Sequence, residues 1–163
     1  MYEPGQRPMY MLTWPDNRKD QAGVGVNWEY LADSNWLLQS VARLDFIHTT
    51  LTSQEAKDHI SILGVTDADR QELLKNLSIS VSRKISPWLK SSISLAYAER
   101  MPTATELYGF YLFNAQDGYD YLGHPGLKPE QSLQGEFSLS AQGKKTRVRA
   151  TVFINHIRHF ISG

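Results

Sequence analysis

Residues 77–97 read LSISVSRKISPWLKSSISLAY, and their pattern decides the fold. Apolar and polar residues alternate from Leu77 to Ile85, and the alternation resumes from Leu89 to Tyr97 after a Ser-Pro turn. Because successive side chains of a β-strand point to opposite faces, a period of two predicts a strand with one apolar face. Two such strands joined by a short turn predict an antiparallel hairpin.

The same alternation recurs along the rest of the chain. It predicts strands over residues 24–30, 38–46, 133–141 and 147–161, with a further candidate over 7–14 that two prolines bracket. Short turns at 32–35 and 142–146 join neighbouring strands into hairpins. The sequence therefore predicts an all-β fold, an antiparallel up-and-down meander of about six strands.

The connections between the strands alternate between short and long. The long ones are expected at 49–75 and 101–131, and structureless connections of that length are usually functional. In a meander every second connection lies on the same side, so both long loops should emerge at one rim, as in outer-membrane barrels. Helices are expected in the first long loop over 53–59, behind a serine cap, and over 67–75, which begins acidic and ends basic.

Large aromatic residues are placed at the ends of the predicted strands. Trp28, Tyr30, Trp36 and Trp88 all lie close to short turns. Such a row is typical of the interfacial belt of a transmembrane β-barrel. The alternative is a soluble β-sandwich, in which aromatics at strand ends cover the core.

Composition narrows the classes of function. The 163 residues include 17 basic and 17 acidic side chains and no cysteine, so there is no basic surplus for nucleic acid and no thiolate site. The longest apolar run, 107–113, is far shorter than the roughly 20 residues of a membrane-spanning helix. A barrel strand needs only about 9 to 11 residues, so a transmembrane barrel stays possible.

Two segments carry a resemblance to a known family. They are YAERMPTATELY at 97–108 and GHPGLKPEQS at 123–132. They resemble the R-x-P…E-L-Y and G-N-P-x-L-K-P-E-x-S segments that flank an external loop in TonB-dependent outer-membrane receptors, with His124 in place of the usual Asn. Residues 43–45 and 152–161 are similar to other barrel strands of that family, so the resemblance covers roughly 24–163.

The resemblance implies an origin and a function. Residues 1–163 would be a partial TonB-dependent receptor β-barrel domain in the cell outer membrane, with long external loops and with the plug domain and remaining strands of a barrel of about 22 strands absent. An apolar strand that stops at Gly163 also predicts a fragment. The partners implied are outer-membrane lipid, TonB through the missing plug, and a small-molecule or chelate cargo: siderophore-iron, haem, cobalamin, another metal chelate or a glycan. No residue pattern selects among these cargoes.

The second long loop contains the candidate binding residues. They are Tyr108, Tyr111, Tyr119, Tyr121 and His124. Exposed aromatic rings offer stacking area at low entropic cost, and neighbouring Asn, Gln and Asp side chains can orient a solute. The alternative is that these rings pack the loop against itself and fix its shape.

Metal and catalytic sites find little support in the sequence. His156 and His159, three residues apart on a strand, point to opposite faces and would not share an ion, so no metal site is predicted. The acid pairs Glu99–Glu106 and Asp117–Asp120 have no nucleophile beside them, so we predict no catalytic residues, no cofactor and no enzyme.

Two other classes of function stay open beside the receptor. They are a soluble β-sandwich module for ligand binding or adhesion and, less favoured, an outer-membrane hydrolase. Arg43, Arg147 and Arg149 lie on the predicted polar face, where the polar lumen of a barrel accounts for them without a dedicated anion site.

Overall fold

Six long strands form one antiparallel sheet. The computed structural model describes residues 15–62, 64–65, 67–110, 112–116 and 118–162. The strands are β1 (Asn17–Leu31), β2 (Trp36–Leu51), β3 (Arg70–Ser86), β4 (Leu89–Arg100), β7 (Glu130–Gln142) and β8 (Arg147–Arg158). They pair in the order β1-β2-β3-β4-β7-β8, so every strand neighbours the next one of the sheet along the chain, and the predicted meander is confirmed.

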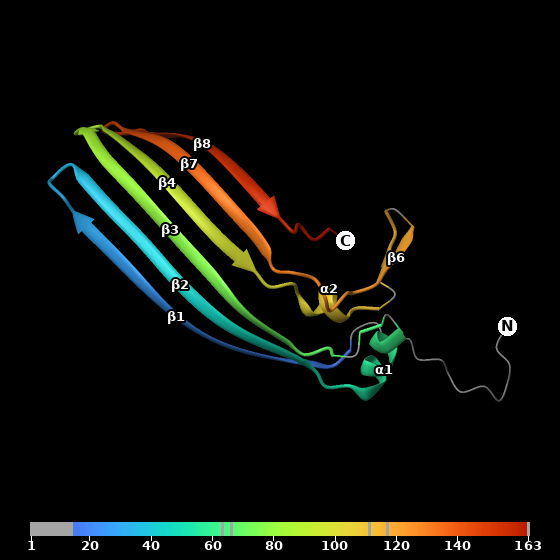
Figure 1. The fold of residues 1–163 in the computed structure, drawn as a ribbon. Helices are drawn as coiled ribbons and strands as arrows, with labels where there is room; N and C mark the ends of the chain where they lie inside the picture. Colours follow the sequence, from blue (N-terminus) through green and yellow to red (C-terminus); the bar gives the residue numbers. More distant parts are fainter. Residues whose placement is uncertain (1–14, 63, 66, 111, 117, 163) are drawn as a thin grey trace, which may run out of the picture.

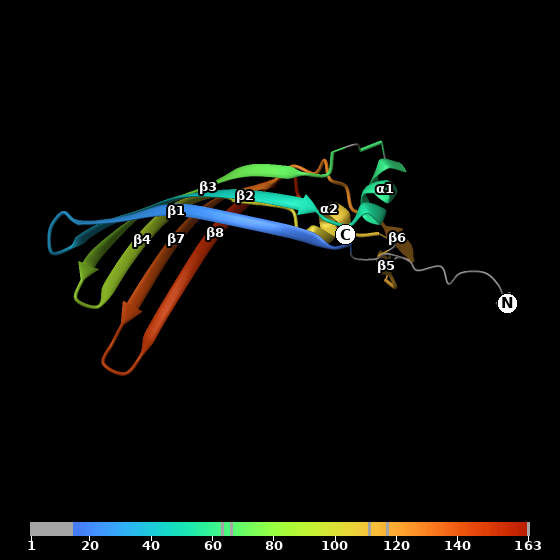
Figure 2. The same ribbon diagram turned by 90° about the horizontal axis from the view of Figure 1, so that it is seen from below.

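The long connections lie together at one end of the sheet. Between β2 and β3 the chain forms α1 (Gln54–Ile62), and between β4 and β7 it forms α2 (Ala104–Tyr108) and a hairpin of β5 (Leu112–Asn114) and β6 (Tyr119–Tyr121). Figures 1 and 2 show these elements at one rim and the tight turns at the other. The predicted placement of the two long loops is confirmed. Within the described residues, no helix is long and apolar enough to cross a membrane.

Cross-strand register gathers the apolar side chains on one face of the sheet, here named the apolar face. One row across it consists of Tyr30, Leu38, Val81, Ile93, Phe137 and Val152. Leu38 and Val81 are half-buried, and the other four side chains are exposed, with Val152 at 72%. The sheet is a single curved layer along most of its length (Figure 2). A soluble sandwich would bury this face, whereas a barrel presents it to lipid.

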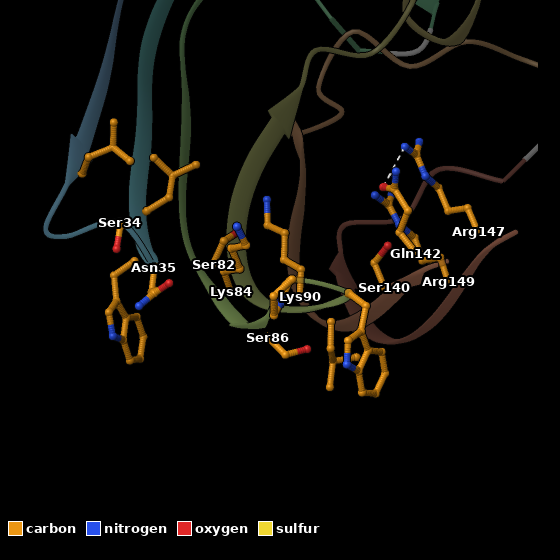
Figure 3. A pocket seen from close by; sticks show the side chains of 16 residues that line it. Ser34, Asn35, Ser82, Lys84, Ser86, Lys90, Ser140, Gln142, Arg147 and Arg149 are labelled. Carbon is orange, nitrogen blue, oxygen red and sulfur yellow. Dashed lines mark hydrogen bonds between the residues drawn. The ribbon is translucent and has the colours of Figure 1, made fainter. Parts of the chain in front are cut away.

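The opposite face, here named the polar face, carries mainly hydroxyl, amide and charged side chains. Near the tight turns it is hollowed into a pocket of about 400 Å³ (Figure 3).

Aromatic side chains stand at the same end of the sheet, as predicted: Trp28 stacks on Tyr30 with ring centroids 5.8 Å apart, and the Arg83 guanidinium lies 5.0 Å from the Trp36 ring. Trp88 is 59% exposed in the β3–β4 turn.

One predicted helix is wrong, and one predicted strand lies outside the described residues. The helix over 53–59 exists as α1, and the Ser53 hydroxyl accepts a hydrogen bond from the Ala56 N–H. Most of 67–75, however, belongs to β3, because Phe46 and His48 of β2 pair with Leu73 and Gln71. Pairing with an existing strand outweighs the weak helix signals of an acidic start and a basic end. The candidate strand over 7–14 is not part of the described structure.

Candidate functional site

The two long loops pack together into one small core, here named the loop core. Its buried side chains come from both loops and from the adjoining strand ends: Ile47, Leu51, Ala56, Ile60, Ala68, Leu74, Met101, Leu107, Tyr108 and Phe110. Ile47, Leu51 and Leu74 belong to the polar face by register. The loops therefore fold over the polar face at this rim instead of extending away from the strands.

Tyr108 ties the second loop to the first. Its side chain is fully buried, and its hydroxyl donates a hydrogen bond of 2.7 Å to the carbonyl oxygen of Ala68. Burial raises the pKa of Tyr108 to about 12, so the phenol keeps the proton that it donates. A second link runs from the Arg70 guanidinium to the carbonyl oxygen of Leu127, at 3.0 Å. The loops form one assembly through both contacts.

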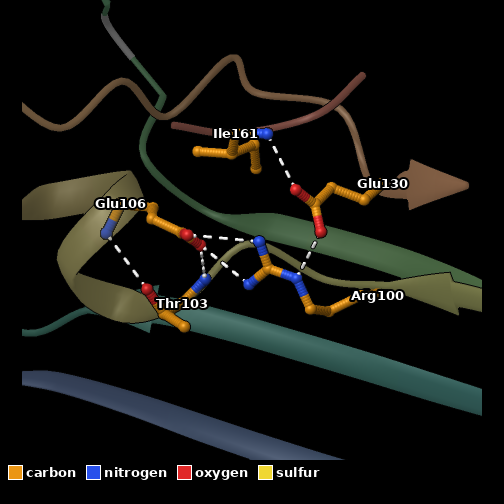
Figure 4. Close-up of polar contacts among 5 residues, drawn as sticks. All are labelled: Arg100, Thr103, Glu106, Glu130 and Ile161. Carbon is orange, nitrogen blue, oxygen red and sulfur yellow. Dashed lines mark hydrogen bonds and ion pairs between the residues drawn. The ribbon is translucent and has the colours of Figure 1, made fainter. Parts of the chain in front are cut away.

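Arg100, at the end of β4, joins the two ends of the second loop (Figure 4). Its Nε donates to Glu130 Oε2 at 2.6 Å, where β7 begins, and its Nη1 donates to Glu106 Oε2 at 3.0 Å. Glu130 Oε1 also accepts the backbone N–H of Ile161, beyond β8, at 2.7 Å. This cluster of charge-assisted hydrogen bonds holds the strand ends and the loop in fixed relation.

Thr103 and Glu106 begin α2 with a reciprocal cap. The Thr103 hydroxyl accepts from the Glu106 N–H at 3.3 Å, and Glu106 Oε2 accepts from the Thr103 N–H at 2.6 Å. Both hydrogen bonds satisfy N–H groups that a helix start leaves without partners. The Glu106 carboxylate thus caps the start of α2 and also accepts a hydrogen bond from Arg100.

The returning chain at 123–125 is clamped against α2. The Gly123 N–H donates to the Gly109 carbonyl at 2.7 Å, and the His124 N–H donates to the Glu106 carbonyl at 2.9 Å. Pro125 is fully buried. A Cβ at Gly123 would stand 2.7 Å from the backbone nitrogens of Tyr108 and Gly109, so the approach of the two segments requires glycine here.

Acid should loosen this loop assembly. Burial pushes the Glu106 pKa up, but hydrogen bonds from Arg100 and Thr103 outweigh burial and leave the pKa below its ordinary value. A carboxyl with a depressed pKa contributes stability that is full above its ordinary pKa and lost as the pH falls through the depressed one. Limited proteolysis of the loop should therefore accelerate as the pH falls below the ordinary glutamate pKa of about 4.3 and through the depressed pKa of Glu106. The variant Glu106→Gln should be cleaved faster at neutral pH and should lose part of this acid dependence; an unchanged profile would contradict the role given to Glu106.

The predicted binding residues occupy different environments. Tyr108 lies inside the loop core, Tyr119 is 68% exposed on β6, and Tyr121 is half-buried beside it. His124 is exposed, and its Nδ1 accepts the Gly126 N–H at 2.9 Å. Tyr111 lies outside the described residues. The structure therefore gives Tyr108 a packing position, while Tyr119, Tyr121 and His124 belong to the outer part of the assembly.

Sequence reasoning missed the interactions among Arg100, Glu106 and Glu130, although all three belong to the quoted motifs. Their spacing along the chain gave no sign that one guanidinium would bind both carboxylates. Asp45, on the polar face of β2, accepts hydrogen bonds from Arg43, at 2.6 Å, and from Gln21. No group of three or more His, Cys, Asp or Glu side chains that could hold a metal ion occurs in the described part of the chain.

A single-layer meander with one apolar face, tight turns at one rim and a packed loop assembly at the other defines a segment of a transmembrane β-barrel. The family model described as "TonB dependent receptor-like, beta-barrel" matches residues 3–163. The chain belongs to this family, which consists of outer-membrane transporters and not of enzymes.

The structure is also similar to a solved one. A structure titled "Copper transporter OprC" superimposes with a TM-score of 0.71 at 19% sequence identity, over 87% of this chain and 21% of that one. The likeness concerns the fold, and the chain spans about a fifth of the length of that protein. No curated protein matches the chain.

Proposed function

We propose that the chain supplies six strands and two external loops of an outer-membrane receptor that captures a scarce extracellular solute and imports it with energy delivered through TonB. The observation that carries the proposal is the match of residues 3–163 to the receptor barrel family. The continuous apolar face supports it, because lipid is the natural neighbour of such a surface. A longer receptor would contribute the plug and the remaining strands.

The loop assembly is the proposed place of capture. It stands at the rim that faces outward in such barrels, and it is held by internal contacts that pre-organise its surface. In this proposal Tyr119, Tyr121 and His124 contact the solute, Tyr108 keeps the assembly in shape, and Tyr111 remains a predicted contact. The candidate cargoes form a panel of siderophore-iron, haem, cobalamin, other metal chelates and glycans. Copper is added to this panel because the similar solved structure is that of a copper transporter, OprC.

Uptake by cells tests the proposal as a whole. Cells that carry the receptor containing this chain should accumulate one labelled cargo of the panel, and the accumulation should disappear when TonB is absent. Loss of the receptor with unchanged uptake of every cargo would contradict the proposal.

The contact residues make a separate prediction. Changing Tyr119 and Tyr121 together to Ala in the receptor should weaken cargo binding by about 2 kcal/mol, or roughly 30-fold, because aromatic anchors dominate binding energy where they are hot spots. Barrel assembly, read as heat-modifiable gel mobility, should stay normal because the two rings lie in the loop hairpin. The matched pair Tyr119→Phe and Tyr121→Phe keeps the stacking area and should retain most of the affinity. Unchanged affinity of the Ala variant would assign these rings to loop packing alone.

A further inference from the structure

A row of positive charges crosses the polar face near the tight turns. In cross-strand register the charges are those of Lys84 on β3, Lys90 on β4 and Arg149 on β8, and the neutral Ser140 of β7 lies between Lys90 and Arg149. Neighbouring strands lie about 4.8 Å apart, and like charges directly opposite each other destabilise an antiparallel pair. Lys84 and Lys90 form such a pair. The pair carries an electrostatic cost that a nearby negative charge would remove.

These side chains line the pocket of about 400 Å³ at this rim (Figure 3). Arg147, which is opposite Gln142, adds a fourth cation. Figure 3 shows Lys90 and the two arginines extending to the same side of the sheet. Serine, asparagine and glutamine side chains complete the polar part of the lining, and none of the lining residues is Asp or Glu.

The cations have no carboxylate partner within the described residues. Salt bridges form elsewhere in the sheet and loops, but none includes Lys84, Lys90, Arg147 or Arg149. Arg147 donates only to a neutral amide, Gln142 Oε1, at 3.0 Å. Asp33, in the nearby β1–β2 turn, accepts the N–H groups of Asn35 and Trp36 and does not line the pocket.

Two acidic residues of the polar face, Glu29 on β1 and Glu136 on β7, do not line the pocket, and Glu29 accepts a hydrogen bond from Gln39 at 2.9 Å. Glu136 precedes Ser140 by four residues on β7, which corresponds to about 13 Å along a strand. Neutral hydroxyls lie between them, where Ser92 and Ser138 share a hydrogen bond of 2.8 Å. The charge of the pocket is therefore not balanced by its own strands.

A hydroxyl of the lining supplies a second, independent observation. Ser86 Oγ is buried and has no hydrogen-bond partner among the described residues. Buried polar atoms in native structures normally have a partner, and a group bound in the pocket would supply one for Ser86. Ser86 is the residue at which the register between β3 and β4 shifts, next to Lys84 and Lys90.

We propose that this pocket is a binding site for multivalent oxyanions, such as polycarboxylates or phosphates. The two guanidinium groups offer forked donors that match the geometry of a carboxylate or a phosphate, and the two ammonium groups supply charge without a fixed geometry. The serine hydroxyls add neutral donors. A bound oxyanion relieves the repulsion between Lys84 and Lys90. The polar lumen of a barrel accounts for isolated cations, but not for four that gather in one pocket without any acid.

Calorimetric titration of the protein in detergent micelles tests the site, with citrate and inorganic phosphate as probes and glycerol as a neutral control. Salt is held at about 0.15 M, because screening at that ionic strength suppresses non-specific attraction beyond roughly 8 Å. The test variant is Lys90→Gln with Arg149→Gln. The matched control is Lys144→Gln with Lys145→Gln, which removes the same charge from the adjacent β7–β8 turn without touching the lining.

Saturable binding of either anion is expected, weakened at least about tenfold in the test variant and changed less than about twofold in the control variant. A thermal melt gives a second readout: citrate should raise the melting temperature of the native protein and of the control, but not of the test variant. Absence of saturable binding to the native protein, or equal weakening in both double variants, would overturn the proposal. Both changes lie on exposed side chains, so far-ultraviolet circular dichroism should show the same strand content in all three proteins.

Discussion

The substitution Ile79→Arg should destabilise the membrane-inserted protein by about 2 to 4 kcal/mol. This is the cost of a charge on the lipid-facing surface near the middle of a barrel strand. Ile79 lies midway along β3 on the apolar face, opposite Ser40 of β2 and Leu95 of β4, and is 46% exposed. Lipid at this depth offers the guanidinium neither water nor a counter-ion, so the charge must be solvated by distorting the bilayer.

The neighbouring position provides the control. Ser80 is the next residue of the same strand and therefore points to the polar face, where Ser94 and Gln39 are its cross-strand neighbours. Ser80→Arg should change the unfolding free energy by no more than about 0.5 kcal/mol. Denaturant unfolding in phospholipid vesicles, followed by heat-modifiable gel mobility, measures both variants. Equal costs at 79 and 80 would mean that the apolar face does not contact lipid.

Alanine at position 123 should open the loop assembly while the strands stay paired. The added Cβ would meet backbone atoms of Leu107, Tyr108 and Gly109 at 2.7 to 2.8 Å, and backbone in a packed core has little freedom to move. Overpacking of this kind typically costs about 1 to 3 kcal/mol. The hydrogen bond from the Gly123 N–H to the Gly109 carbonyl would be strained in addition. We expect the Tyr108 contact to Ala68 to weaken with it, because both segments belong to one core.

Limited proteolysis of the folded protein measures this effect. Cleavage within 101–129 should become at least about tenfold faster in Gly123→Ala, which corresponds to about 1.4 kcal/mol of lost loop stability. The control is Gly143→Ala in the β7–β8 turn, where a Cβ would stand 3.7 Å from its nearest atom, the Thr146 carbonyl oxygen. Heat-modifiable mobility should remain normal in both. Slow cleavage of Gly123→Ala would show that the loop tolerates a wider spacing from α2.

The motif residues that carry the family resemblance have a structural meaning. Arg100, Glu106 and Glu130 bind one another, while Gly123 and Pro125 seat the returning chain against α2. Each of these interactions fixes an end of the second loop. The resemblance is therefore read from residues that position the loop.

The sequence by itself determined the strands, their antiparallel order and the face to which each side chain points. A period of two is a local property, short turns pair the strands of three hairpins, and strands that follow one another in the chain usually lie side by side, so the six-stranded order and both rims followed from the pattern. The aromatic residues at the turn rim followed from their distance to the turns. The first helix followed from its serine cap, because a cap acts within a single turn of helix.

Only the tertiary structure decided the features that depend on pairing across the sheet. Residues 67–75 have local signals of a helix. Most of the segment nevertheless becomes β3, because β2 offers it unpaired backbone N–H and C=O groups for hydrogen bonding. Nothing in the sequence distinguishes Tyr108 from Tyr119. In the fold, Tyr108 is buried and its hydroxyl contacts Ala68, forty positions earlier in the chain, while Tyr119 stays exposed. The cation row exists because register places Lys84, Lys90 and Arg149 in line on three strands. Each of these outcomes depends on contacts between distant segments, which alternation within one strand does not encode.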